Sequence, residues 1–265
     1  MLESLTLGAL QGIVEWLPVS SEGFLTLAQV KLFGSEEPLK ELIRISLFLH
    51  LGTFLAALFY FFEDVLNLSK KLFKFKQASP EEKNIIKFLI LTTIITAIIG
   101  GLLLIAIQGI EERIELGGQV AMGLVGVLLL VTGGLQLKTK KGAGVKTEKN
   151  LRTKDGILLG IMQGFAVLPG LSRSGLTVAG LLLSKFDDAL SLRLSFLMSL
   201  PIVLGGNVAL NMDKFIFNSE FFWGLLVSFV FGFITIHYLL KVARKVNFAY
   251  FVLVFGALTT LAAFI

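Results

Sequence analysis

The sequence has no cysteine, only 5 prolines and only 2 histidines among its 265 residues. The absence of cysteine excludes a disulfide framework, a thiolate metal site and a cysteine nucleophile. Charged residues are also scarce, at 16%, compared with the roughly 25% that is usual for soluble domains. The composition therefore argues against a soluble protein.

Hydrophobic residues are abundant, at 55%, and the mean hydropathy is +0.83. Because the apolar runs cover nearly the whole length, we predict a single all-α integral membrane domain spanning residues 1–265. A helix needs about 20 apolar residues to cross a bilayer. Six segments meet this requirement, at 43–62, 85–107, 119–137, 194–210, 221–240 and 248–265.

Two further apolar stretches, 2–30 and 156–184, are interrupted near their middle by Pro, Gly and Ser. Each interruption leaves half-helices of about a dozen residues, which are too short to span a bilayer. Non-helical backbone at membrane depth is tolerated only where it is buried in protein or lines a watery cavity. We therefore predict two re-entrant broken-helix segments.

The distribution of lysine and arginine predicts the orientation of the spans. If alternate connectors face the cytoplasm and both broken segments return to their own side, 18 of the 24 Lys and Arg residues lie inside and 5 outside. The net charge of +5 then reflects membrane topology, and no nucleic-acid partner is expected. Arg173 is the remaining basic residue, and it is placed inside an apolar segment.

This topology makes the two halves of the chain, about 1–137 and 156–265, an inverted repeat joined by a basic cytoplasmic loop, 138–155. The stretches LGALQGIVEWLPVSSEG (7–23) and LGIMQGFAVLPGLSRSG (159–175) share Leu-Gly, Gln-Gly, Leu-Pro, serines and a closing Gly. Inverted repeats with broken helices generally place their binding site near the middle of the membrane, where the breaks meet.

The second break carries the residue types of an oxyanion or phosphate site. A guanidinium is costly in hydrocarbon, so Arg173 should face a partner or a watery cavity, and its two-pronged geometry suits a phosphate or a carboxylate. Glycines next to a helix start let backbone N–H groups approach an anion. The predicted cradle comprises Gly170, Ser172, Arg173, Ser174, Gly175 and Thr177. The alternative is a structural ion pair between Arg173 and Glu15.

In the first break, Gln11 and Glu15 are four residues apart and share one helix face. Glu15 lies in the apolar part of its segment and is a candidate base or metal ligand. Glu22 has a functional interpretation and a structural one, as a loop charge or helix cap. His50 stands alone in an apolar span, where a histidine is more often a packing residue than a catalytic one.

The motifs QGIVEWLPVSSEG and PGLSRSGLT, together with LHLGT and FLMSLP, resemble signatures of the undecaprenyl pyrophosphate phosphatase family of the bacitracin-resistance type. The resemblance extends over essentially the whole chain. It implies an enzyme of the cell membrane that hydrolyses a polyprenyl diphosphate to the monophosphate and inorganic phosphate, recycling the lipid carrier for peptidoglycan and other envelope glycans. It also implies dependence on a divalent cation, Mg²⁺ or Ca²⁺, and a fold of two inverted re-entrant repeats with six spans.

The resemblance also assigns roles to individual residues. Glu15, Ser21, Ser172 and Arg173 are the expected catalytic residues, with Glu15 as the metal ligand. The expected substrate-binding residues are Gln11, Ser20, Gly170, Ser174, Gly175 and Thr177. The nucleophile is either Ser21, activated by Glu15, or a water molecule held in the same place.

This chain departs from the family pattern at Phe24, where members commonly have a histidine in SSxGHL. Phenylalanine cannot transfer a proton, so either the reaction needs no imidazole there, or His50 or Glu22 substitutes for it, or the activity has been lost. A rival hypothesis is a polyprenyl-phosphate flippase or secondary transporter, which uses the same inverted-repeat architecture. The sequence leaves the oligomeric state open, with a homodimer among the alternatives.

Overall fold

The computed structural model describes residues 1–17, 20–37, 39–111, 118–138, 144–168, 171–211, 219–242 and 249–262. Within these ranges the chain is almost entirely helical, and extended pairing is limited to one β-bridge between Lys146 and Phe186. The prediction of an all-α protein is therefore confirmed.

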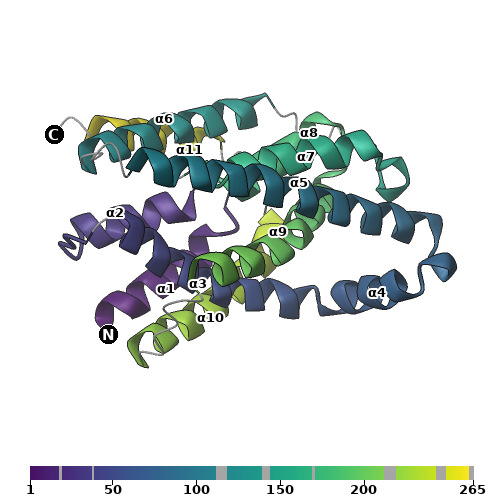
Figure 1. The fold of residues 1–265 in the computed structure, drawn as a ribbon, viewed down its shortest axis with the longest axis horizontal. Coiled ribbons are helices and arrows are strands. Elements are labelled where there is room, and N and C mark those ends of the chain that lie inside the picture. The colour runs from purple at the N-terminus through teal and green to yellow at the C-terminus, as the bar shows by residue number, and fades with distance from the viewer. Residues whose placement is uncertain are drawn as a thin grey trace.

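Eleven α-helices and two short 3₁₀ helices are assigned in the described residues (Figure 1). They are α1 (Leu2–Val14), α2 (Ser21–Lys31), α3 (Leu39–Tyr60), α4 (Phe62–Phe73), η1 (Phe75–Gln77), α5 (Pro80–Glu111), α6 (Gly118–Leu137), η2 (Glu148–Asn150), α7 (Thr153–Phe165), α8 (Arg173–Leu183), α9 (Asp188–Asn211), α10 (Ser219–Val242) and α11 (Ala249–Ala262).

Four of the described helices are long and apolar enough to cross a membrane. They coincide with four of the six predicted spans and lie at Glu41–Tyr60, Pro80–Ala106, Asp188–Val208 and Phe221–Leu240. The other two predicted spans fall on α6 and α11. The apolar helix described within α6 is Gly126–Leu135, and residues 263–265 at the end of the last predicted span lie outside the described residues.

Both interrupted stretches form a pair of short helices, as predicted. The first stretch gives 13 residues in α1 and 11 in α2, and the second gives 13 in α7 and 11 in α8. At 1.5 Å per residue even the longer helices are about 20 Å long, less than the roughly 30 Å of bilayer hydrocarbon. Pro18, Val19, Pro169 and Gly170, between these helices, lie outside the described residues.

Glycines allow α1 to pack closely on α10, and α7 to pack closely on α5 (Figure 1). A Cβ atom on Gly12 would lie 2.6 Å from Phe231 Cβ and 2.7 Å from the backbone nitrogen of Gly232. A Cβ atom on Gly160 would lie 2.7 Å from Ile95 Cβ. Small residues bring helix backbones together in membranes, where dispersion forces replace the hydrophobic effect as the source of packing energy.

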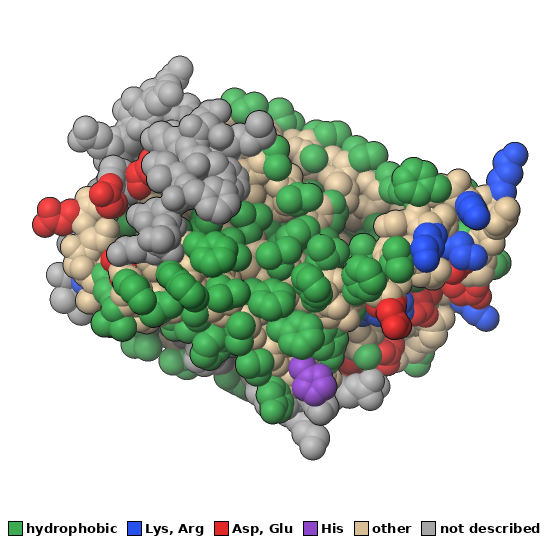
Figure 2. Space-filling view, turned by 90° about the horizontal axis from the view of Figure 1, so that it is seen from below, with side chains coloured by type: hydrophobic (Ala, Val, Ile, Leu, Met, Phe, Trp, Pro, Cys, Tyr) green, Lys and Arg blue, Asp and Glu red, His purple; other side chains and the backbone are tan. Residues whose placement is uncertain are grey.

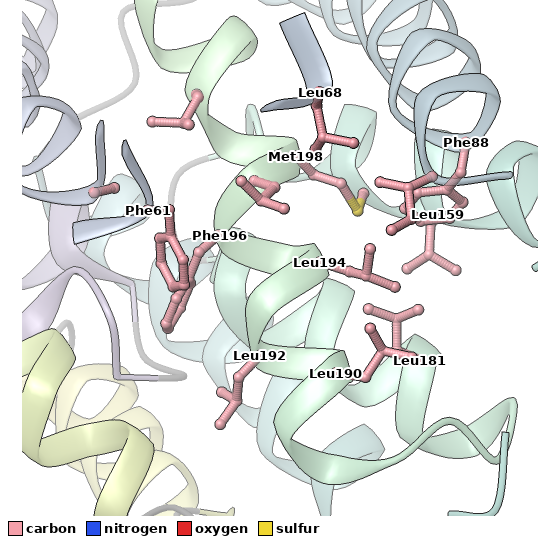
Figure 3. Close-up of a cluster of buried hydrophobic side chains, with 14 of the residues drawn as sticks. Phe61, Leu68, Phe88, Leu159, Leu181, Leu190, Leu192, Leu194, Phe196 and Met198 are labelled. Carbon is pink, nitrogen blue, oxygen red and sulfur yellow. The ribbon is translucent and has the colours of Figure 1, made fainter. Parts of the chain in front are cut away.

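A hydrophobic cluster around α9 holds the middle of the protein together (Figure 3). Phe196 on α9 packs beside Phe61, and Met198 and Leu194 point toward Leu159 and Leu181 of the second broken segment (Figure 3). Trp16, just after α1, joins this cluster through an edge-to-face contact with Phe196 at 4.9 Å between ring centroids. Its indole N–H donates to the Gly232 carbonyl at 3.1 Å. The first break is thereby fixed against both α9 and α10.

The surface has the character expected of a membrane protein. A broad hydrophobic face separates two polar ends, and Lys and Arg gather at one of them (Figure 2). At the start of α9, Arg193 donates to both carboxylate oxygens of Asp64 on α4 and, at 3.3 Å, to Glu148 of η2. This partly exposed cluster ties the connector between the halves to the helix ends.

The close packing of α7 on α5 predicts that Gly160→Ala destabilises the protein. The added methyl would overlap Ile95, and overpacking typically costs about 1–3 kcal/mol. Thermal unfolding in detergent should show a lower midpoint for this variant. Gly101→Ala on α5 is the matched control, because nothing lies within 4 Å of its added Cβ. Equal midpoints for the two variants would contradict the proposed packing role of Gly160.

Candidate active site

The two helix breaks meet through an ion pair between Arg173 and Glu15, which are 158 residues apart in the chain. Glu15 is the residue that caps the C-terminal end of α1, and Arg173 is the first residue of α8. Their side chains are 4% and 15% exposed, respectively. The predicted structural pairing of these residues is therefore present, and it gathers the chemistry of both breaks at one buried place.

Each break ends in a serine that caps the following helix. Ser20 accepts a hydrogen bond from the backbone of Gly23 at 3.2 Å, and Ser172 accepts one from Gly175 at 3.0 Å. A serine in this position satisfies a backbone N–H that has no partner within the helix. Ser20, predicted to bind substrate, and Ser172, predicted to be catalytic, are thus helix caps in the structure, and the backbone N–H of Gly175, also predicted to bind substrate, is the donor to Ser172. The caps set the positive N-terminal ends of α2 and α8 beside the ion pair.

The second carboxylate oxygen of Glu15, Oε2, is surrounded by three polar groups. Gln11 Nε2 donates to it at 3.0 Å and Ser21 Oγ donates at 2.8 Å. His50 Nε2 lies 3.0 Å away from the same oxygen. Four of the predicted residues, Gln11, Glu15, Ser21 and His50, are therefore in direct contact, and all are buried.

Serine and threonine hydroxyls support the arginine side of the site. Ser174 Oγ donates to the Leu17 carbonyl at 2.9 Å, so it joins the start of α8 to the first break. Thr177 Oγ1 donates to the Arg173 carbonyl at 2.9 Å and lies 2.7 Å from Ser195 Oγ on α9. Ser174 and Thr177, predicted as phosphate contacts, bond in the structure to the backbone of the first break and to the Arg173 carbonyl; their contact with phosphate stays a prediction.

Sequence reasoning missed Ser46, Thr53 and Ser195. Ser46 and Thr53 lie on α3, where their spacing of −4 and +3 from His50 puts all three on one helix face. That spacing around a histidine inside a predicted span could have indicated these residues. Ser195 had none, because serines at 191, 195 and 199 form a regular row that does not distinguish one member.

Two buried polar atoms of the site have no hydrogen-bond partner among the described residues. They are Arg173 Nη1 and Gln11 Oε1. Buried polar groups are usually hydrogen-bonded, and leaving one unpaired costs roughly 1–3 kcal/mol or more for a charged group. An ion pair that served only as a structural link would not need an additional donor. The Nη1 donor is therefore available to a ligand beside Arg173.

The remaining predictions concern Glu22, Phe24 and Gly170. Glu22, on the first turn of α2, is partly buried and interacts electrostatically with Glu15, His50 and Arg173. Phe24 packs against Val14 and Leu129. Gly170 lies outside the described residues.

The donor set does not fit a resident metal ion on Glu15. One carboxylate oxygen is bonded to the Arg173 guanidinium, and the other accepts from Gln11 and Ser21 and lies beside His50. A bound divalent cation would lie against that guanidinium and be repelled by it. No group of three His, Asp or Glu side chains suited to a metal occurs in the part of the chain that the structure describes.

Fold and site together define a class: a helical membrane protein in which two broken segments bring a carboxylate, a guanidinium and a serine hydroxyl to one buried point. Residues 4–261 match the family described as bacitracin resistance protein BacA. The chain belongs to this family, and the resemblance inferred from its motifs is confirmed.

Named relatives match this chain over nearly its full length. The chain is 40% identical to an undecaprenyl-diphosphatase of Methanococcoides burtonii, over 99% of this chain and 98% of that protein. It is 36% identical to an undecaprenyl-diphosphatase of Haloarcula marismortui, over 97% and 95% of the two chains. An undecaprenyl-diphosphatase of Desulforudis audaxviator is 34% identical, over 95% and 92%.

The capping role of Ser172 predicts that Ser172→Ala lowers the free energy of unfolding by about 1 kcal/mol, while Ser172→Gly costs only a few tenths. Reversible unfolding in mixed detergent micelles measures both. The exposed Ser69→Ala on α4 is the control and should change little. If Ser172→Gly is as destabilising as Ser172→Ala, the hydroxyl does more than cap α8.

Proposed function

We propose that this protein hydrolyses an undecaprenyl-type diphosphate to the monophosphate and inorganic phosphate. The observation that carries the proposal is the buried, unpartnered Nη1 of Arg173, a residue that contacts one oxygen of the Glu15 carboxylate while the Ser21 hydroxyl donates to the other. The names of the three relatives supply the substrate class. Such an enzyme recycles the lipid carrier of cell-envelope glycan synthesis and acts in the plasma membrane as a multi-pass protein.

In the proposed reaction, Arg173 holds the terminal phosphate. Its free Nη1 donates to a phosphate oxygen, and the helix N-termini of α2 and α8 add positive potential. Phosphoryl transfer depends mainly on positioning and on stabilising the charge of the equatorial oxygens. Gln11 and Glu15 orient the attacking group. Ser174 joins the start of α8 to Leu17, and Thr177 donates to the Arg173 carbonyl, so both fix the backbone that carries Arg173.

Ser21 Oγ is the proposed nucleophile. As its bond to phosphorus forms, the bond between phosphorus and the bridging oxygen breaks, and undecaprenyl monophosphate leaves with the electron pair. Water then splits the phosphoserine and releases inorganic phosphate. The alternative nucleophile is a water molecule in the same place, and it gives the same products without a phosphoserine.

The divalent cation, Mg²⁺ or Ca²⁺, enters this proposal with the substrate. Mg²⁺ usually binds phosphate oxygens and retains several waters, with one or two carboxylates at most. A diphosphate therefore carries its own cation to a site whose protein charge already includes Arg173. On this view, Glu15 serves Arg173 and Ser21 rather than the metal.

We also propose that the fold is the predicted inverted repeat of six spans, with halves 1–137 and 156–265. Residues 152 positions apart make matching contacts. Ser20 and Ser172 form matching caps. Likewise, α1 packs on α10 as α7 packs on α5.

The flippase hypothesis predicts movement of the lipid without release of phosphate. The names of the relatives give it no support. A flippase site would also have no use for a serine hydroxyl held 2.8 Å from a carboxylate beside the anion site.

Phosphate release from undecaprenyl diphosphate with added Mg²⁺ or Ca²⁺ tests the proposal. We expect Arg173→Ala to be slower by about 10²-fold or more, the typical effect of removing one donor to the transition-state charge. Arg173→Lys should recover only part of the rate, because it keeps the charge but loses the fork. Arg193→Gln, which removes an arginine bonded to Asp64 and Glu148 rather than to the site residues, should react as wild type. No release by folded wild-type protein that still binds the lipid would favour the flippase.

Trapping the intermediate separates the two nucleophiles. Rapid acid quenching during turnover of ³²P-labelled diphosphate should give labelled protein, with the label on Ser21 by peptide mass. Ser21→Ala should abolish both label and turnover. Wild-type turnover in ¹⁸O water without any labelled protein, together with activity in Ser21→Ala, would assign the attack to water.

A further inference from the structure

His50 is held in one orientation by its own helix. It lies on α3 within the span Glu41–Tyr60 and is 6% exposed. Its Nδ1 is 2.7 Å from the carbonyl oxygen of Ser46, one turn earlier. A carbonyl can only accept a hydrogen bond, so Nδ1 must carry a proton. In the neutral ring, Nε2 is then the nitrogen with the free lone pair.

Nε2 faces the reacting groups of the site. It lies 3.0 Å from Glu15 Oε2 and 3.3 Å from Ser21 Oγ, which is itself 2.8 Å from Glu15 Oε2. A neutral His50 and an ionised Glu15 would place two acceptors against each other in a buried site, which is unfavourable. One proton therefore lies between His50 Nε2 and Glu15 Oε2. The Ser21 hydroxyl donates to this pair.

We infer that His50 is a further catalytic residue, which together with Glu15 takes the proton of Ser21 Oγ during attack on phosphorus. This inference rests on the proposed function. When the Oγ–P bond forms, the proton moves from Oγ to the Glu15–His50 pair, while the leaving monophosphate takes the electron pair of the broken P–O bond. When water splits the phosphoserine, its oxygen bonds to phosphorus as the Oγ–P bond breaks, the pair returns that proton to Oγ, and both protons of the water leave with the inorganic phosphate. The pair ends with the single proton it held at the start.

This role distinguishes between the alternatives raised by Phe24. Among the described hydrogen bonds, those of Ser21 Oγ go to Glu15 and His50, and none goes to Glu22. Phe24 lies one turn after Ser21 on α2, but its ring packs against Val14 and Leu129. The imidazole of this site therefore comes from α3, not from α2. The backbone of Ser46 fixes its tautomer.

Kinetics of matched histidine variants tests the inference. His50→Gln should slow phosphate release by about 10²-fold or more, the usual contribution of a positioned acid–base group. Binding of a non-hydrolysable methylene diphosphonate lipid should change less than about threefold, because Arg173 is intact. Imidazole added to His50→Ala should restore part of the rate. His237→Gln, the other histidine of the chain, should behave as wild type. A His50→Gln rate within twofold of wild type would overturn the inference.

A spectroscopic measurement is independent of activity. In the His237→Gln background His50 is the single histidine, so ¹⁵N-histidine NMR reports it alone. We expect a protonated Nδ1, and an Nε2 signal that shifts in Glu15→Gln. An unprotonated Nδ1 would refute the tautomer and with it the proton transfer.

The two proposals fail in different ways. If wild-type protein releases no phosphate, the proposed function fails, whereas normal release with an active His50→Gln variant refutes only the role of His50.

Discussion

The ion pair between Glu15 and Arg173 is the constraint on which the site depends. Removing a charge from water costs several kcal/mol, so each of these buried residues needs the other. Each also stands at the end of a helix that is too short to cross the bilayer. The pair joins two irregular stretches of backbone that would be unfavourable at membrane depth if they were not buried in protein. The helix caps, the packed helix breaks and the candidate catalytic groups all lie around this contact.

Some polar side chains around the ion pair hold the backbone of the site in place, whereas Arg173 keeps one donor available for a ligand. Trp16, Ser174 and Thr177 bond to backbone groups or neighbouring hydroxyls and hold the two breaks in register. Arg173 Nη1 is left as a donor without a partner among the described residues. A site organised in this way loses little freedom when an anion binds, because its side chains are already positioned.

The sequence predicted the helical class, the two interrupted segments and most residues of the site, because these depend on local signals. Length and hydropathy revealed the spans, Pro and Gly revealed the breaks, and Arg173 was conspicuous in an apolar run. The sequence could not show which hydroxyls would bond to the protein itself. Ser20, Ser172 and Thr177 belong to motifs predicted to act on the substrate, and in the structure Ser20 and Ser172 cap helices while Thr177 bonds to the Arg173 carbonyl. The contact of His50 with Ser21 and Glu15 also depends on tertiary structure, because it joins α3 to the first break.

The separation of 158 residues between Glu15 and Arg173 has a consequence for biogenesis. Chains grow at about 5–20 residues per second, so Glu15 is made roughly 8–30 seconds before its guanidinium partner. His50 follows Glu15 much sooner, only 35 residues later in the chain. During synthesis the imidazole is the first partner available to the carboxylate. In the nascent first half, Glu15 can therefore pair with His50 in the membrane until Arg173 of the second half has been synthesised.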